Sequence, residues 1–350
     1  MKHKTIESRV LSIYRKVSPS FIDIENKTVG DEFLIIRKRL FRILGICEQL
    51  FNGKSLLDIG AGTGEKSLHY ASLGAKITLV EPNQVSCSRA RNLFKEKGLE
   101  HKSVDIVNTG LYDINPSLVS KFDIVICDGV LHHTYSPAKG LELILNNMKS
   151  GASLLLSMAE TAGCMKRTLQ RKLIYSVAGD NEDAIAKASL KYFNEHIKRA
   201  ARHGQRSLDA VIYDSYVNPQ VQPTDLKTLC NLFLKYKFTY ISSMPSLKQV
   251  FNVQPWANVD PVNGFDYNKN KDYYAFLEKV WACSGDSTSE SKELKKMNLP
   301  QFSRRVERDY KNLLNLAKKI RAKRFSLSDL KPVRSGHNGV GNTYFFASKD

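Results

Sequence analysis

The sequence predicts an α/β protein with a Rossmann-like, doubly wound, seven-stranded and mostly parallel sheet. Three observations support this prediction. Short apolar runs alternate with helix-like segments between residues 53 and 158, a three-glycine turn joins the first run to the helix after it, and the alternation returns near residue 225. Strands that alternate with helices form βαβ units, whose parallel sheet is covered by helices on both faces.

The first 158 residues supply five of the predicted strands. Residues 1–52 are expected to be mostly helical, because Ile36, Leu40, Ile43 and Leu44 recur at helical spacing before Gly53. Strands are expected at 55–59, 77–80, 104–107, 123–127 and 153–158. Helices are expected at 65–73, 84–97 and 141–148, each followed within a few residues by a glycine.

The regular alternation stops after Met158. Two helices are expected within 165–203, the first marked by an apolar stripe of Leu169, Leu173, Ile174 and Val177. A helix at 225–237 and a strand at 240–243 resume the pattern, and a final strand is expected at 342–347. Between them lie an aromatic-rich stretch at 248–281, a polar linker candidate at 284–291 and an amphipathic helix at about 302–323.

Composition excludes several classes of protein. The chain has 350 residues, of which 42% are hydrophobic and 25% charged, which excludes wholesale disorder and collagen-like structure. No uncharged apolar run approaches the roughly 20 residues that span a bilayer. The first residues lack an apolar signal core, and the six cysteines form no CxxC pair, so we expect a cytoplasmic protein without a zinc ribbon or disulfide frame.

The net charge of +18 is concentrated in the second half of the chain. Residues 1–150 contain 21 Lys and Arg against 16 Asp and Glu, whereas residues 151–350 contain 32 against 19. Such a charge attracts nucleic acid, an anionic substrate or an acidic membrane surface. Because the basic residues are mixed with acidic ones, a solvated lysine-rich surface is the simpler interpretation.

The strongest motif is the segment Leu56–Gly64, Leu-Leu-Asp-Ile-Gly-Ala-Gly-Thr-Gly. Glycines let the backbone turn sharply and approach a ligand, and the helix that follows offers free N–H groups to an anion. Glu81 lies 21 residues after Gly60, at the end of the second strand, where an acid can accept both hydroxyl hydrogens of an adenosine ribose. Nicotinamide sites prefer GxGxxG, whereas these glycines read GxGxG.

With these motifs the chain resembles the class I S-adenosylmethionine-dependent methyltransferases. The resemblance extends over about residues 55–158 and rests on motifs in the family's order and spacing: Asp58–Gly64, Val80-Glu81-Pro82, Phe122–Val125, Gly129–Thr134 and Met148–Gly151. It implies a last strand that inserts antiparallel, S-adenosyl-L-methionine as cofactor and S-adenosyl-L-homocysteine as product. No metal is implied.

The resemblance also implies roles for residues at the carboxyl ends of the strands. The methionine portion of the cofactor would be held by Asp58, Gly60, Ala61, Gly62 and Gly64. Asp128 would face the same end or be buried as a structural cap, and Gly129 would also bind the cofactor. Glu81 would hold the ribose, and Pro82 would lie near the adenine. Family members often carry an acid after the third strand that meets the adenine amino group. This chain has Thr109-Gly110-Leu111 there, so only backbone groups and Leu111 are expected to pack against the base.

The acceptor side carries fewer signals. His132 and His133 follow the fourth strand, and either could act as a general base or a hydrogen-bond donor, or serve as a framework residue. Tyr213, Asp214 and Tyr216 lie in a stretch similar to one in a bacterial subgroup of the family, where an insertion after the fifth strand caps the active site. They would line the acceptor pocket, or form a tight loop anchored by its own hydrogen bonds.

The sequence therefore predicts an enzyme that transfers a methyl group to N or O of a small molecule. Two alternatives stay open, an RNA methyltransferase that uses the basic second half and a non-catalytic binding module. No membrane partner is expected, and the oligomeric state is not predicted. The expected organisation is helices over the cofactor site at 1–52, the cofactor core at 53–158, a helical cap at 159–222, a core helix and strand at 223–247, a second cap at 248–341 and the last strand at 342–350.

Overall fold

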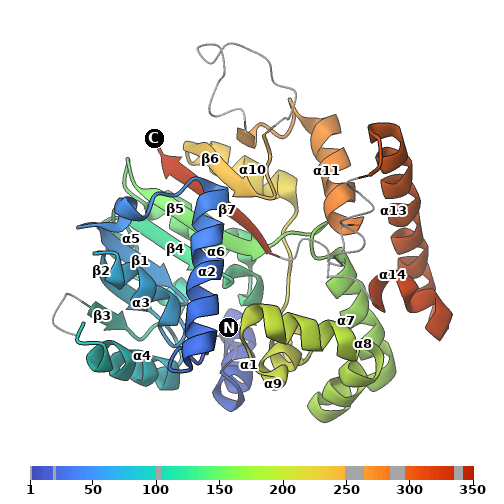
Figure 1. Ribbon diagram of the computed structural model, residues 1–350, viewed down its shortest axis with the longest axis horizontal. Coiled ribbons are helices and arrows are strands. Elements are labelled where there is room, and N and C mark those ends of the chain that lie inside the picture. The colour runs from blue at the N-terminus through green and yellow to red at the C-terminus, as the bar shows by residue number, and fades with distance from the viewer. Residues whose placement is uncertain (1, 19–20, 100–103, 249–263, 284–295, 335–341) are drawn as a thin grey trace. The chain divides into compact units, whose positions relative to one another are not determined.

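The computed structural model describes residues 2–18, 21–99, 104–248, 264–283, 296–334 and 342–350. The chain divides into two compact units (Figure 1). Unit 1 comprises residues 1–158, 220–269 and 343–350, and unit 2 comprises residues 159–219 and 270–342. Among the predicted features, residues 249–263 of the aromatic-rich stretch and the linker candidate at 284–291 lie outside the described residues.

Unit 1 is built on one seven-stranded sheet in the order β3-β2-β1-β4-β5-β7-β6. Strands β1 to β5 pair in parallel, and β7 pairs with β6 antiparallel, which confirms the predicted fold class and the antiparallel last strand. The strands are β1 (Ser55–Ile59), β2 (Lys76–Val80), β3 (Val104–Val107), β4 (Ile124–Asp128), β5 (Ser153–Ala159), β6 (Phe238–Met244) and β7 (Asn342–Lys349).

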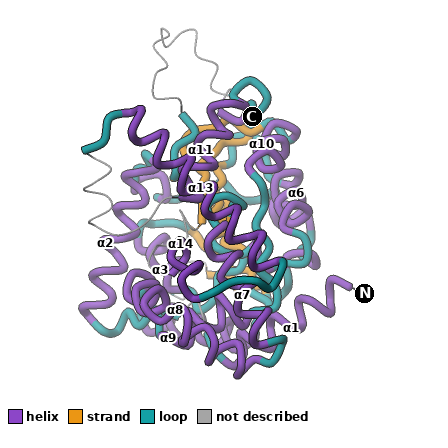
Figure 2. The backbone as a smooth tube through the Cα atoms, turned by 90° about the vertical axis from the view of Figure 1, so that its right-hand side faces the viewer, coloured by secondary structure: helices purple, strands orange, loops and turns teal. Residues whose placement is uncertain are grey.

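Helices cover both faces of the sheet. In Figure 2 the orange strands run between purple helices, with α6 and α10 together on one side. The C-terminal end of α10 is tied to α6 by Lys235 and Tyr236, which both bond Glu142. In the part of unit 1 that the structure describes, the helices include α1 (Lys2–Lys16), α2 (Lys27–Leu44), η1 (Glu48–Phe51), α3 (Glu65–Ser72), α4 (Gln84–Glu96), η2 (Leu111–Asp113), α5 (Pro116–Val119), η3 (Leu131–His133), α6 (Pro137–Asn147) and α10 (Leu226–Lys235).

The central strands are buried on both faces, as strands of a covered parallel sheet must be. Alternate residues of each strand contribute to opposite cores. On the face covered by α2, α3 and α4, the rings of Phe41, Phe51 and Tyr70 stack on one another. They pack on a hydrophobic cluster that includes Leu56, Ile77, Leu79, Ile124, Ile126 and Leu155.

Phe265, from the predicted aromatic-rich stretch, packs among the aromatic side chains of this unit. The ring of Phe265 is fully buried, stacks on Phe233 at 4.3 Å and meets Tyr240 edge-on at 5.2 Å. A side chain at Gly264 would strike the ring of Tyr240, which explains the glycine there. The residues of this stretch that lie in α11 belong to unit 2.

Unit 2 is helical. Its elements are α7 (Met165–Ala178), α8 (Glu182–Gly204), α9 (Leu208–Ile212), the π-helical turn η4 (Tyr213–Val217), α11 (Lys271–Cys283), α13 (Leu299–Arg321), η7 (Leu327–Leu330) and α14 (Lys331–Arg334). Leu169, Leu173 and Ile174 form the predicted buried stripe of α7, whereas Val177 is 47% exposed. Val177 lies in the last turn of α7, which ends at Ala178.

Candidate functional site

The glycine turn after β1 has the conformation that the motif requires. Gly60, Gly62 and Gly64 all have positive φ angles, of 72°, 61° and 91°. The N–H groups of Gly60 and Ala61 both donate to the carbonyl of Val80, which ties the turn to β2. A Cβ at Gly60 would lie 2.4 Å from the side chain of Val130 in the loop after β4. Only glycine satisfies both the backbone angle and this close approach.

Glu81 joins the glycine turn to the end of β2. One carboxylate oxygen accepts the N–H of Gly62 at 2.9 Å, and the other accepts the N–H of Asn83 at 2.8 Å. Burial raises the pKa of Glu81, and the two backbone N–H groups oppose this by favouring the ionised form. The carboxylate is thereby fixed in one orientation, and each oxygen keeps further lone-pair capacity for a ligand hydroxyl.

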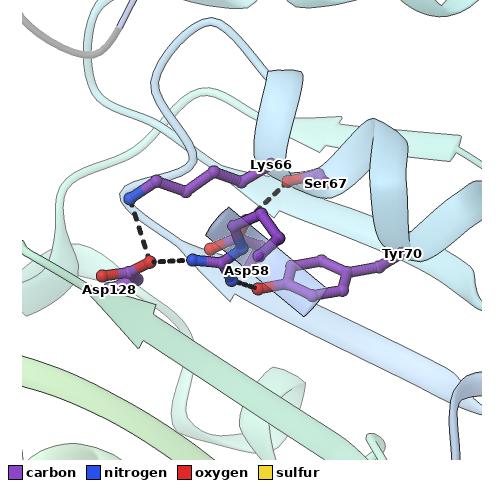
Figure 3. A network of polar contacts seen from close by, with 6 residues as sticks. Asp58, Lys66, Ser67, Tyr70 and Asp128 are labelled. Carbon is purple, nitrogen blue, oxygen red and sulfur yellow. Dashed lines mark hydrogen bonds and ion pairs between the residues drawn. The ribbon is translucent and has the colours of Figure 1, made fainter. Parts of the chain in front are cut away.

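A buried ion cluster stands at the end of β4. The carboxylate of Asp128 forms ion pairs with Nζ of Lys66 at 2.9 Å and with Nη1 of Arg37 at 3.1 Å. The side chain of Asp128 is 5% exposed. Figure 3 shows Lys66 and Asp128 directed toward each other, with Tyr70 on the opposite side of the cluster. Burial opposes ionisation, yet Lys66 and Arg37 hold the pKa of Asp128 well below its usual range. Arg37 also donates to the hydroxyl of Tyr70.

Asp58 lies beneath the turn and anchors the next helix. It is buried and accepts the hydroxyl of Ser67 from the first turn of α3. Burial raises the pKa of Asp58 to about 6, although Ser67 and Lys66 favour its charged form. Asp58 therefore connects the strand, the glycine turn and α3. Its predicted contact with the cofactor stays a prediction.

The residues expected near the adenine follow β2 and β3. Pro82 is half-buried, and Asn108 donates to the carbonyl of Glu81 at 2.8 Å. Leu111 is buried, and its side chain packs where any Cβ at Gly140 would be placed. The side chain of Leu111 therefore packs against α6. The part of this loop left for contact with a ligand is chiefly the backbone around Gly110.

The two predicted histidines differ in environment. His132 is buried, whereas His133 is half-buried, and their rings lie 4.1 Å apart. Nδ1 of His133 lies 2.9 Å from the carbonyl oxygen of Gln220. A carbonyl oxygen only accepts, so Nδ1 carries the proton and the lone pair of the neutral ring is on Nε2. The ring of Tyr14 from α1 meets His133 edge-on.

The three predicted acceptor residues all lie in η4 of unit 2. Tyr216 is fully buried and donates its hydroxyl to Gln170, while Arg171 donates to the carbonyls of Ser215 and Tyr216. Asp214 pairs with Arg206 at 3.0 Å. Tyr213 is half-buried. Within unit 2 these contacts make Tyr216 part of the core, and the predicted role of the three residues in acceptor binding stays a prediction.

Sequence reasoning missed Arg37 and Lys66. The buried face of α2 is formed by Phe33, Arg37, Phe41 and Leu44, which follow i, i+4, i+8 and i+11 spacing. An arginine in the middle of such a face is the available signal, because arginine is almost never fully buried unless it is paired. The predicted stripe drew attention instead to Ile36 and Ile43, which are exposed.

No group of three or more His, Cys, Asp and Glu side chains in the described part of the chain is arranged to hold a metal ion. Among the same residues, none of the helices is both long enough and apolar enough to cross a membrane.

The raised pKa of Asp58 predicts how stability depends on pH. The pKa rises from 3.8 to about 6 on folding, so the folded protein holds the proton more tightly than the unfolded chain. The stability linked to this group is complete below about pH 4 and is lost as the pH rises through about 6. Asp58→Asn cannot ionise, and its amide oxygen still accepts from Ser67. We expect the variant to gain up to about 3 kcal/mol of unfolding free energy, relative to the wild type, between about pH 4 and pH 7.

Urea unfolding of both proteins at several pH values in this range measures the difference. Any pH-independent cost of the amide group cancels in the comparison. A difference that stays constant across the range would show that Asp58 titrates normally.

Comparisons with known proteins agree with this geometry. A family model described as a methyltransferase domain matches residues 50–218. The mitochondrial ubiquinone biosynthesis O-methyltransferase of Schizosaccharomyces pombe is 29% identical over 154 residues, which cover 42% of this chain and 51% of that protein. The tRNA U34 carboxymethyltransferase of Helicobacter acinonychis is 34% identical over 80 residues, which cover 21% of this chain and 29% of that protein.

The structure of PKMT2 from Rickettsia typhi in complex with AdoHcy is similar at a TM-score of 0.47 with 16% identity, over 67% of this chain and 50% of that one. The chain spans about half the length of the curated relatives it matches. The matched family model begins just before β1 and includes the glycine turn, Glu81 and Asp128. Together with the strand order β3-β2-β1-β4-β5-β7-β6, the match shows that this chain carries a class I S-adenosylmethionine-dependent methyltransferase domain.

Proposed function

We propose that the chain transfers a methyl group from S-adenosylmethionine to a small molecule, with a hydroxyl oxygen as the acceptor atom. The observation that carries the cofactor part is Glu81, which is held across the glycine turn by the N–H groups of Gly62 and Asn83. Such a fixed carboxylate suits the two adjacent hydroxyls of a ribose. A nitrogen acceptor is the alternative that the experiments below distinguish.

The charges beside the turn fit the amino acid end of the cofactor. Lys66 and Arg37 offer cations to a carboxylate, and Asp128 offers an anion to an ammonium group. The side chain of Lys66 is 35% exposed, so a ligand can reach it without unfolding the cluster. When bound, the cofactor supplies an electrophilic methyl group on a sulfonium. The protein's part is to hold both ends of the ligand and to keep the reacting centre dry.

His133 is the proposed base for a hydroxyl acceptor. The hydrogen bond from Nδ1 to the carbonyl of Gln220 orients the ring and leaves the lone pair on Nε2. A hydroxyl is a poor nucleophile until it begins to lose its proton, and an oriented imidazole can take that proton. The name of the ubiquinone O-methyltransferase relative supports the choice of oxygen. His132, which is buried, is assigned a framework role.

Replacing Glu81 tests the cofactor site. The wild-type chain should bind S-adenosylhomocysteine and give no heat with NAD in a calorimetric titration. Glu81→Ala should weaken the binding of S-adenosylhomocysteine by about 10- to 150-fold, because a charge-assisted pair of hydrogen bonds is lost. Asp123→Ala is the matched control, since this acid pairs with Lys149 at the opposite end of the strands. Unchanged affinity in a folded Glu81→Ala variant would mean that the ribose is held elsewhere.

Replacing His133 tests the acceptor chemistry. With a hydroxyl acceptor, His133→Gln should reduce the rate of methyl transfer by about 10²- to 10⁴-fold, because glutamine can donate to Gln220 but cannot act as a base. The affinity for S-adenosylhomocysteine should be unchanged. Single-turnover rates with paired phenol and amine acceptors, measured across pH, are the readout. A loss of less than about tenfold with the hydroxyl acceptor and an unchanged pH profile would remove His133 from acid–base chemistry.

RNA methylation is the second candidate, and the surface of α13 favours it. Arg304, Arg308, Lys311 and Lys318 are exposed and follow one helix face, opposite the buried Val306, Leu313 and Ile320. Residues 304–324 contain nine basic and two acidic side chains. A stripe of cations spanning 14 residues is about 21 Å long, the length of several phosphates. One relative is named as a tRNA carboxymethyltransferase, which points in the same direction.

A salt-dependence measurement separates the two candidates. If α13 binds RNA, the logarithm of the affinity for a single-stranded RNA should fall steeply with the logarithm of salt concentration. Arg304→Ala with Lys311→Ala should reduce that slope by about 0.7 for each cation removed. Lys97→Ala, which breaks an exposed pair with Glu25 in unit 1, is the control. Weak binding with an unchanged slope in the double variant would leave α13 as a solvated surface.

A further inference from the structure

The N-terminal helix α1 presents a polar group on its inward face. Val10 and Ile13 are buried, and Glu7 and Tyr14, one turn to either side of Val10, are half-buried on the same side of the helix. The carbonyl of Tyr14 accepts from the side chain of Asn83, the residue after Pro82. The inward face of α1 therefore meets the carboxyl edge of the sheet beside Glu81.

One turn before Val10, Glu7 reaches the loop that follows β3. Its Oε2 lies 3.7 Å from the position that a Cβ at Gly110 would occupy. The backbone of this loop is tied to Glu81, because the N–H of Glu81 donates to the carbonyl of Val107 and Asn108 donates to the carbonyl of Glu81. Burial raises the pKa of Tyr112, and the charge of Glu7 adds to this rise, which agrees with their closeness.

The strand order determines on which side of Glu81 a nucleobase must lie. Glu81 ends β2, which stands between β1 and the edge strand β3. The ion cluster proposed for the amino acid end of the cofactor is on the β1 and β4 side, around Asp128. A ribose held by Glu81 carries its base on the carbon opposite that end. The base must therefore extend toward β3, where Gly110 and Glu7 lie.

We propose that Glu7 supplies, from α1, the carboxylate that accepts a hydrogen bond from the exocyclic amino group of the adenine. The loop after β3 continues with Thr109, Gly110 and Leu111, none of which carries an acid. Glu7 makes the site selective for adenine over hypoxanthine, because a carboxylate accepts from an amino group and is repelled by a carbonyl oxygen at the same place. This inference rests on the proposed function.

Asp113 is the other residue that could supply a carboxylate at this position. Its Oδ2 lies 3.8 Å from the same point beside Gly110, a distance similar to that of Glu7. Asp113 is exposed, whereas Glu7 is half-buried on the inward face of α1. A hydrogen bond is stronger where water is excluded, so Glu7 is the better placed of the two. Asp113 provides a matched control in the experiment.

The experiment compares two ligands on the full-length chain by calorimetry. The ligands are S-adenosylhomocysteine and its deaminated analogue S-inosylhomocysteine, which carries hypoxanthine. The wild type should prefer the adenine ligand. Glu7→Ala should weaken S-adenosylhomocysteine binding by about tenfold or more and leave the inosine ligand unchanged. Glu7→Gln should strengthen binding of the inosine ligand relative to wild type, because the glutamine amide can donate to its carbonyl oxygen.

A second readout separates ligand contact from simple loss of helix packing. Amide hydrogen exchange in α1 should slow when S-adenosylhomocysteine binds to the wild type, and slow much less in Glu7→Ala. Asp113→Ala should keep both the ligand preference and the protection. The inference is overturned if Glu7→Ala weakens both ligands equally, changes neither, or if Asp113→Ala alone abolishes the preference. Failure of the wild type to bind S-adenosylhomocysteine at all would instead overturn the proposed function.

Discussion

The ion cluster of Arg37, Asp128 and Lys66 connects the elements on which the site depends. It joins α2, the end of β4 and the first turn of α3. The charged groups of Arg37 and Asp128 are almost fully removed from water, whereas the side chain of Lys66 is 35% exposed. Taking such charges out of water is costly, and removing one partner leaves an unpaired charge in the interior. The cluster therefore stabilises one arrangement of three elements more than it stabilises the fold as a whole. The glycine turn leads into α3 and touches Val130 in the loop after β4, so its position follows from the positions of these elements.

The conformation of the glycine turn is fixed by hydrogen bonds on one side and by side-chain packing on the other. The carbonyl of Val80 holds its first two N–H groups, and the carboxylate of Glu81 holds the N–H of Gly62. Val130 packs so close to Gly60 that no larger residue fits. Backbone groups that are already bonded do not rearrange when a ligand arrives, which lowers the entropic cost of binding.

The bounds of the first five strands could be predicted from sequence with little error, because the central strands β1, β2, β4 and β5 are buried on both faces and appear as continuous apolar runs. β1 and β3 have the predicted bounds, and the ends of β2 and β4 differ from prediction by one residue. The inward face of α2 could not be predicted in the same way. Ile36 and Ile43 have the stronger hydrophobic pattern but are exposed, and the buried face instead contains Arg37. The expectation that charged residues lie on the surface fails where a charged side chain forms an ion pair with a residue distant in sequence.

The predicted site residues fall into two groups, those whose positions follow from a local motif and those whose environment depends on contacts distant in sequence. Positions that depend on backbone geometry, such as Gly60 and Glu81, follow from motif spacing alone. The environment of Tyr216 could not be predicted in this way. The local sequence around a tyrosine is the same whether its side chain faces a ligand or, as here, bonds Gln170 inside the unit 2 core. The contact that decides its environment is 46 residues away in the chain. No local pattern contains that information.

The charges of the site also bear on how it would distinguish substrate from product. With Asp58, Glu81 and Asp128 ionised against Arg37 and Lys66, these five residues together carry one net negative charge. Under the proposed function this complements the methyl donor, whose sulfonium and ammonium groups outnumber its one carboxylate. Loss of the methyl group leaves a ligand without net charge, so the long-range attraction weakens when transfer is complete. Burial raises the pKa of Asp58 to about 6. The difference in attraction between the methyl donor and the uncharged product is therefore largest above that pH and diminishes below it.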